Sequence, residues 1–168
     1  MKKQILITSA LCLGLMASAE TIDVKSFRYA GPYAVQKPYM IDNVDVNSKE
    51  FSMKSMLDTP LSLDVLEQTP VSSQLPALSG NALHVLAFNV QNTSYTKAKL
   101  KVEGLANYQV YVDGKKASGE LALNPATHTI IIKCLSEEGK AETPKVTLET
   151  EKDGILAIRE DGNRLYTL

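Results

Sequence analysis

The side chains with the most versatile chemistry in this sequence are its two histidines and Cys134, one of its two cysteines, and each lies within an apolar run. His84 falls in ALHVLAFNV and His128 in THTIIIKCL. A catalytic zinc site uses three protein ligands and a structural site uses four, and the sequence nominates no third donor beside these histidines. We therefore expect both to be core or surface histidines, and we predict no bound metal and no other cofactor.

The motifs of common catalytic sites are absent. The sequence contains no G-x-S-x-G nucleophile elbow, no H-E-x-x-H zinc helix, no G-x-x-x-x-G-K-[ST] phosphate loop and no G-x-G-x-x-G dinucleotide loop. The oxygen-rich stretch from Asp42 to Glu50 lacks the glycine that an EF-hand loop needs at its sharp turn, which favours a solvated turn over a calcium site. We predict no catalytic residue and no enzyme activity for this chain by itself.

Cys134 is open to two interpretations, a small buried residue or a reactive thiol. It shares one period-2 face with Ile130 and Ile132, as expected for a strand with a buried face. The sequence shows no basic neighbour and no helix start that would lower the pKa of this thiol. The pattern favours the buried residue.

The tyrosines offer candidates for contact with a ligand or a partner. In the run Tyr108–Val112, Tyr111 alternates with two valines, and Asp113-Gly114 follows, the dipeptide best suited to a two-residue hairpin turn. A tyrosine on the solvent side of a strand can stack on a sugar or contact a protein, although tyrosine is also common on such surfaces. Tyr108, Tyr111 and Asp113 are the candidate contact residues.

The first 19 residues have the three parts of a secretory signal peptide. Lys2 and Lys3 form a basic start, an apolar stretch runs from Ile5 to Met16, and Ala17-Ser18-Ala19 is a small-residue cleavage signal. The apolar stretch is shorter than the ~20 residues that cross a bilayer as a helix. We expect a signal peptide over 1–19, no membrane span, and a secreted or periplasmic bacterial protein.

Residues 20–168 have the size of one domain. The sequence carries 18 basic and 19 acidic residues, so it lacks the positive surplus that nucleic acid attracts. Residues 20–79 are irregular and rich in proline, which predicts edge strands, turns or wrapping segments. Within them we expect one short helix in Asn47–Leu57 and an exposed loop at Gln74–Asn81.

Residues 80–168 carry short apolar runs at intervals of about 8–12 residues between turn signals, which is typical of a β-sandwich. Lys97–Glu103 alternates charged and apolar residues and should be half solvated, whereas Ala82–Val90 is apolar on both faces and should be buried between two layers. The predicted strands are Ala82–Val90, Lys97–Glu103, Tyr108–Val112, Leu121–Leu123, Thr127–Leu135, Lys145–Glu149, Leu156–Arg159 and Arg164–Leu168. The predicted fold is an all-β, antiparallel, jelly-roll-like sandwich with an irregular N-terminal wrapping segment.

The central part of the sequence is similar to jelly-roll accessory modules of secreted bacterial enzymes. Tyr108–Lys116 (YQVYVDGKK) resembles the strand that rises into their hairpin, and Leu123–His128 (LNPATH) resembles the turn before a later strand. Ala126 stands where glycine is usual, and the calcium and sugar ligands of such modules have no identifiable counterparts. This resemblance implies the fold but does not identify a ligand.

A second resemblance covers most of residues 20–168. Four stretches resemble the N-terminal region of secreted serine peptidases of the prolyl-oligopeptidase or dipeptidyl-peptidase type from Bacteroides-like bacteria: Phe27–Tyr33, Leu57–Leu61, Val112–Lys116 and Arg159–Leu168. In that family a β-propeller and an α/β-hydrolase domain follow, and the sequence contains neither, so no catalytic residue carries over. The strand-like ending at Leu168 suggests a domain excerpt, although a paired terminal strand would end in the same way.

Three functions stay open. The leading hypothesis is a non-catalytic accessory module that packs against the propeller or hydrolase domain of such a peptidase, or against another protein. An independent carbohydrate-binding module would bind a glycan through the tyrosines near the hairpin and would lose affinity in Tyr111→Ala. A free-standing structural or adhesion protein should protect its sheet edges, whereas an accessory module can expose an apolar patch where its partner docks.

Overall fold

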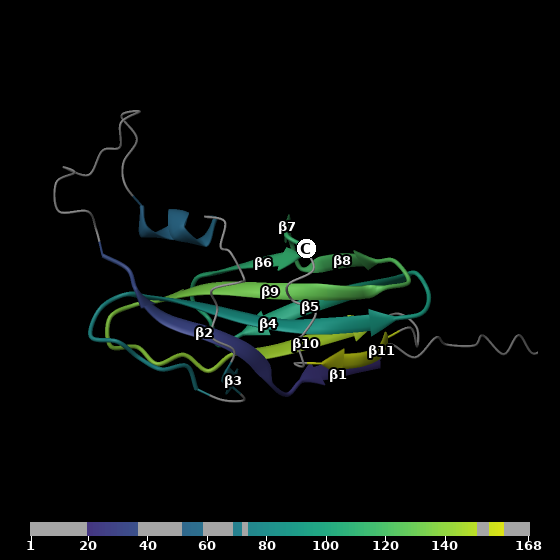
Figure 1. Cartoon of the computed structure of the whole chain (residues 1–168), viewed down its shortest axis with the longest axis horizontal. Helices are drawn as coiled ribbons and strands as arrows, with labels where there is room; N and C mark the ends of the chain where they lie inside the picture. The colour runs from purple at the N-terminus through teal and green to yellow at the C-terminus, as the bar shows by residue number, and fades with distance from the viewer. Residues whose placement is uncertain (1–19, 37–51, 59–68, 72–73, 151–154, 160–168) are drawn as a thin grey trace, which may run out of the picture.

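Two antiparallel β-sheets pack face to face and form a sandwich (Figure 1). The computed structural model describes residues 20–36, 52–58, 69–71, 74–150 and 155–159. Almost no helix is present, which confirms the predicted all-β class.

The first sheet has four strands in the order β1 (Glu20–Val24), β10 (Lys145–Thr150), β5 (Thr96–Glu103) and β8 (Glu120–Leu123). The second sheet has seven. Its order is β3 (Thr69–Val71), β2 (Phe27–Ala34), β4 (Ala82–Asn92), β9 (Thr127–Ser136), β6 (Tyr108–Val112) and β7 (Lys115–Ala117), and β11 (Ile155–Arg159) also pairs with β4.

Eight of these strands follow the jelly-roll order. The row β1-β10-β5-β8 faces the row β4-β9-β6-β7, and every connection from β4 to β10 crosses between the sheets except the β6–β7 hairpin. This alternation is the topology of a double-sheet jelly roll. Strands β2, β3 and β11 extend the second sheet beyond this frame.

The core between the sheets comes from the period-2 faces that the sequence predicts. On β5, Ala98 and Leu100 are buried while the lysines between them are exposed, as expected for a half-solvated strand. On β9, Ile130, Ile132 and Cys134 share the inner face. The largest side chains with almost no exposure are Phe27, Phe88, Leu75, Leu86, Leu123, Ile130, Ile132 and Leu148.

Asp113 and Gly114 form the predicted hairpin turn between β6 and β7. Their φ angles are +49° and +77°, and Val112 pairs with Lys115 across the turn. Positive φ at both central residues is the geometry that Asp-Gly favours, because its twist matches that of the flanking strands.

The N-terminal part is more regular than the sequence suggests. Glu20–Val24 and Phe27–Ala34 are both strands. Phe27–Ala34 has no regular alternation of apolar residues, because Gly31-Pro32 interrupts it where its register on β4 shifts. The expected short helix is a single 3₁₀ turn, η1 (Met53–Leu57). The loop at Gln74–Asn81 has no regular structure, but Leu75 within it is buried in the core rather than exposed.

Several predictions concern residues outside the described ones. These are the signal peptide over 1–19, the oxygen-rich stretch from Asp42 to Glu50 and the strand Arg164–Leu168.

The outer face of the seven-stranded sheet is apolar as well. Ala30, Val85, Ala87 and Ile131 form one buried cluster on it. Beside that cluster, Met53, Met56 and Leu57 of η1 pack against a second group on the same face, formed by Val35, Leu83 and Leu135. The 3₁₀ turn lies outside the sandwich on this side (Figure 1), which explains why β4 is apolar on both faces.

Candidate functional site

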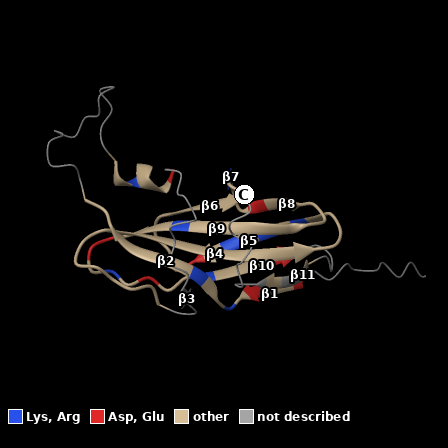
Figure 2. Cartoon of the chain, viewed as in Figure 1, with Lys and Arg blue, Asp and Glu red and all other residues tan. Residues whose placement is uncertain are grey.

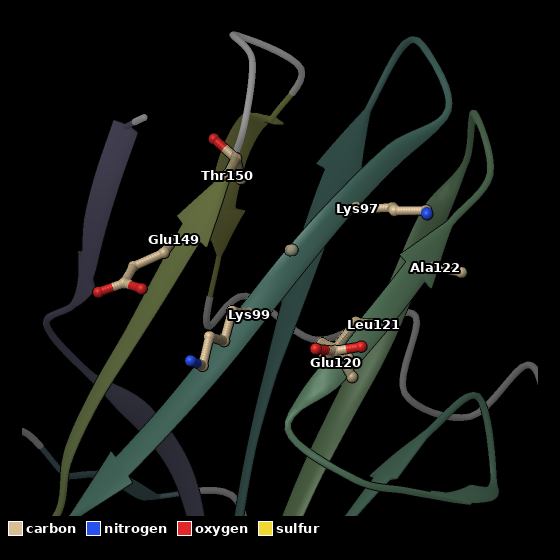
Figure 3. Close-up of a pocket in the computed structure, with 8 residues that line it drawn as sticks. Lys97, Lys99, Glu120, Leu121, Ala122, Glu149 and Thr150 are labelled. Carbon is tan, nitrogen blue, oxygen red and sulfur yellow. The ribbon is translucent and has the colours of Figure 1, made fainter. Parts of the chain in front are cut away.

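The outer face of the four-stranded sheet is open to solvent and contains a hollow of about 620 Å³ (Figure 3). One wall is a row of charged residues in register across three strands, Glu149 on β10, Lys99 on β5 and Glu120 on β8. Lys97 on β5 and its register partner Ala122 on β8 form the other wall. The hollow therefore crosses the strands of the sheet.

The floor of the hollow is backbone. Thr150, Ala98 and Leu121 form the row between the two walls, and all three side chains are buried. Ala98 and Leu121 belong to the core between the sheets. The short Ala122 side chain leaves the hollow open on the β8 side. In Figure 3 the Lys97 side chain extends towards β8 and the Lys99 side chain towards β10.

Residues of both charges occur along the strands of this sheet (Figure 2), and the row Glu149, Lys99 and Glu120 combines them on the outer face. Glu149 is paired with Lys101, and Lys145 is paired with Glu103 at 3.7 Å. Lys145 and Glu103 stand directly opposite each other in the β10–β5 register, whereas Lys101 reaches Glu149 diagonally, and solvent screening keeps the contribution of both exposed pairs to stability small. The face can offer ammonium donors and carboxylate acceptors to a polar partner, and no aromatic side chain lines the hollow.

The three candidate contact residues do not form one site. Tyr108 is exposed at the start of β6. Tyr111 points to the opposite side of the sheet from the core, as its alternation with Val110 predicts, but its hydroxyl donates a hydrogen bond to the Leu57 carbonyl at 2.6 Å. Tyr111 therefore fixes η1 on the outer face of the seven-stranded sheet.

The surroundings of Tyr111 are charged. The Lys133 ammonium lies 5.0 Å from the centre of the Tyr111 ring, a cation–π distance, and burial lowers the pKa of Lys133. Lys116 pairs with Asp58 at 2.7 Å beyond the end of η1. Burial raises the pKa of Tyr111, and the Asp58 charge raises it further. These contacts hold the 3₁₀ turn against β6, β7 and β9.

Asp113 is a structural partner of His128. Its carboxylate accepts from His128 Nδ1 at 2.6 Å and from the Thr129 backbone N–H at 2.9 Å, while His128 Nε2 donates to the Asn124 carbonyl at 2.9 Å. Burial lowers the pKa of His128, but the hydrogen bonds to Asp113 and Asn124 outweigh burial and raise it overall. Both ring nitrogens are engaged as donors, the state that an imidazolium provides.

His84 and Cys134 lie in the core, as the sequence predicts. His84 has no exposed surface and contacts the Tyr29 hydroxyl and the Ser136 hydroxyl. Burial raises the pKa of the Cys134 thiol, and the nearby Glu142 carboxylate raises it further, so the thiol is protonated at neutral pH.

Neither a known family nor a known fold relative is found for this chain: no family model, no curated protein and no solved structure matches it. Within the described residues, no three His, Cys, Asp or Glu side chains are arranged to hold a metal ion. The same residues contain no helix with the length and apolar character that a bilayer span requires.

The hollow is the feature that sequence reasoning missed. The alternation of lysine and apolar residues over Lys97–Glu103 indicates a solvated face, but the hollow depends on which residues of β8 and β10 stand in register with it. The one available signal is the small Ala122 between Leu121 and Leu123, which predicts a gap on an otherwise charged face.

Proposed function

We propose that this chain is a non-catalytic interaction module of a secreted or periplasmic protein, and that it binds its partner through the outer face of the four-stranded sheet. The exposed, hollowed and charge-alternating surface of that face supports the proposal. The opposite face of the sandwich is already occupied by η1 over part of its area.

The structural use of the reactive side chains also supports a non-catalytic role. His128 and Asp113 bind each other, His84 is sealed in the core, and the Cys134 thiol is buried. A general base or nucleophile must reach its substrate within hydrogen-bond distance; His84 and Cys134 are sealed in the core, and the Asp113 carboxylate is already engaged by His128 and by the Thr129 N–H.

The partner we favour is the propeller or hydrolase domain of a serine peptidase of the prolyl-oligopeptidase type, in agreement with the sequence resemblance. Interfaces between domains of one chain bury about 600–1,500 Å² and are more polar than obligate interfaces. The face of paired lysines and glutamates fits such a polar contact, whereas the apolar patch expected of an accessory module is not formed by the described residues. The exposed large apolar side chains among the described residues, Tyr33, Tyr95 and Tyr108, are dispersed along the chain.

The mass of the native gene product, measured with an antibody to this chain, is the first test. A product with several times the 18.3 kDa mass of this chain supports the accessory role. A product of this size alone overturns the peptidase assignment, and so does turnover of a proline-containing dipeptide reporter by the purified chain.

Lysine footprinting then tests the face itself. Amine-reactive labelling of Lys97 and Lys99 should be lower in the larger product than in this chain alone, because a bound partner covers them. Lys25 and Lys115, which are exposed elsewhere, are the matched controls and should label equally in both. Equal labelling of all four lysines would place the contact on another surface.

A glycan is the second candidate partner, because the hollow offers hydrogen-bond donors and acceptors across the strands. Calorimetry with a panel of polysaccharides should then show binding that Lys99→Ala weakens and Tyr111→Ala leaves in place, since Tyr111 holds η1 instead. A flat response across the panel removes this candidate.

A further inference from the structure

A chain of side-chain hydrogen bonds crosses three strands of the seven-stranded sheet inside the sandwich. It joins Tyr29 on β2, His84 on β4 and Ser136 on β9. The Tyr29 hydroxyl lies 3.0 Å from His84 Nδ1, and His84 Nε2 lies 2.8 Å from Ser136 Oγ. All three side chains are buried, so no water replaces a contact that is lost.

The direction of these hydrogen bonds requires a neutral His84 ring. Ser136 Oγ donates to the Ala82 carbonyl at 3.4 Å, so it accepts from His84 Nε2–H. Nδ1 is then the nitrogen with the lone pair, and it accepts from the Tyr29 O–H. A second ring proton would sit on Nδ1 and face the Tyr29 hydroxyl proton, so the hydroxyl would have to turn its proton away and accept instead, and the bond between β2 and β4 would be lost in its present direction.

The groups around His84 provide little electrostatic stabilisation for a protonated, positively charged imidazole. From β2, the Tyr29 hydroxyl contacts the His84 ring, and burial raises the pKa of Tyr29. From β9, the buried Cys134 is its register partner. From the β9–β10 connection, the Glu142 carboxylate lies near Cys134, and its Oε1 accepts from the Ala106 N–H at 3.1 Å. Burial lowers the pKa of His84.

The backbone pairing of β2 with β4 changes register close to this bond. Arg28, Tyr29 and Ala30 pair with β4 in one register, and the register shifts before Tyr33. The Tyr29–His84 contact therefore holds β2 at the point where its ladder to β4 is interrupted, and the outer neighbour β3 has only three residues.

We propose that His84 is an acid-sensitive latch: its neutral ring holds β2 on the seven-stranded sheet, and its protonation makes local opening of β2 more frequent while the four-stranded sheet stays protected. His128, at the other end of the β4–β9 pair, has the opposite response because its two ring N–H groups already donate to Asp113 and Asn124. An exported protein that meets acid would respond through β2 alone.

Hydrogen–deuterium exchange of the purified full chain at pH 7.5, 6.0 and 5.0, corrected for the intrinsic exchange rate, tests the latch. Protection of Phe27–Ala34 should fall on acidification, by up to about tenfold for each unit by which the folded pKa of His84 lies below that of the open state. Protection of Thr96–Glu103, in the other sheet, should stay constant. These pH values lie above the ordinary pKa of carboxylates and span that of histidine.

His84→Gln is the decisive variant, because an amide can donate to Ser136 and does not titrate. It should remove the acid response of β2, whereas the matched variant His128→Gln should keep it. Equal protection of β2 at pH 5.0 and 7.5 in the wild type overturns the proposal, as does an unchanged acid response in His84→Gln.

The imidazole resonances of the wild type provide a second measurement if His84→Gln does not fold. The chain has two histidines, so their titrations can be separated by comparison with His128→Gln. The proposal requires His84 to titrate below pH 6.5 together with loss of β2 protection. Titration of His84 without any change in β2 overturns it.

Discussion

Asp113→Asn isolates the charge in the Asp113–His128 pair. Asparagine tolerates the positive φ of 49° at this turn, and its amide oxygen can still accept from the Thr129 N–H. What the variant loses is the carboxylate that lies 2.6 Å from His128 Nδ1. The turn and the strand register should therefore be unchanged.

The expected cost is about 1 kcal/mol at pH 6. A hydrogen bond to a charged group contributes roughly 1.5–3 kcal/mol. The Asp113 side chain is 39% exposed, so solvent screening places the value below that range. For a chain of this size the melting temperature should fall by about 2–4 °C.

The cost should depend on pH. Because the pKa of His128 is raised in the folded state, its stabilisation is fully present below its unfolded pKa of about 6.5 and is lost as the pH rises through the folded pKa. Urea unfolding at pH 6 and pH 9 should therefore show a larger difference between wild type and variant at pH 6. Asp23→Asn, the same change at an exposed position on β1, is the control and should have little effect at either pH. An equal cost of Asp113→Asn at both pH values would refute the assignment of the charge to this pair.

Three further predictions follow from single contacts. Gly104→Ala should destabilise the fold by about 3 kcal/mol or more, because its φ is +77° and the added Cβ would lie 2.0 Å from the Thr143 carbonyl oxygen. The control Gly114→Ala has the same φ but open space around it, so it should cost only about 1–2 kcal/mol in urea unfolding. Equal costs of the two variants would contradict the close packing at Gly104. Tyr111→Phe removes the hydrogen bond to the Leu57 carbonyl, so it should lower the free energy of unfolding by about 1 kcal/mol and make the Met53–Leu57 segment more sensitive to proteolysis. Unchanged cleavage there would show that η1 is held by its apolar contacts alone. Cys134 should resist a thiol reagent at pH 8 in the native protein and react rapidly in urea, because burial raises its pKa; fast native labelling would contradict its place in the core.

Local sequence pattern predicts most strands of the second half of the chain, but it missed β7, and the predicted strand Arg164–Leu168 lies outside the described residues. Alternation on Lys97–Glu103 and on Thr127–Leu135 identifies which residues face the core, and β5 and β9 follow it. The Asp113-Gly114 turn also follows from local sequence, because a positive φ at both positions is a property of the dipeptide.

Contacts between residues far apart in the sequence could not be predicted from local sequence pattern. Tyr29 and Ser136, which fix the state of His84, lie 55 and 52 residues away along the chain. Tyr111 and Asp113 were predicted to contact a ligand or partner because they lie at a hairpin. In the structure their side chains form hydrogen bonds with η1 and with β9 instead. The hollow likewise requires three strands to be brought into register.

The strands at the ends of the two sheets are all short, and this affects how readily a second copy of the chain could pair with them. β1 and β8 have five and four residues, and β3 and β7 have three each. A long, flat edge is a template on which a second chain can add a strand, and repeated addition leads to amyloid-like assemblies. Edges of three to five residues offer few unpaired backbone groups to such a chain. The short edge strands therefore lower the tendency of the sandwich to grow into fibrils.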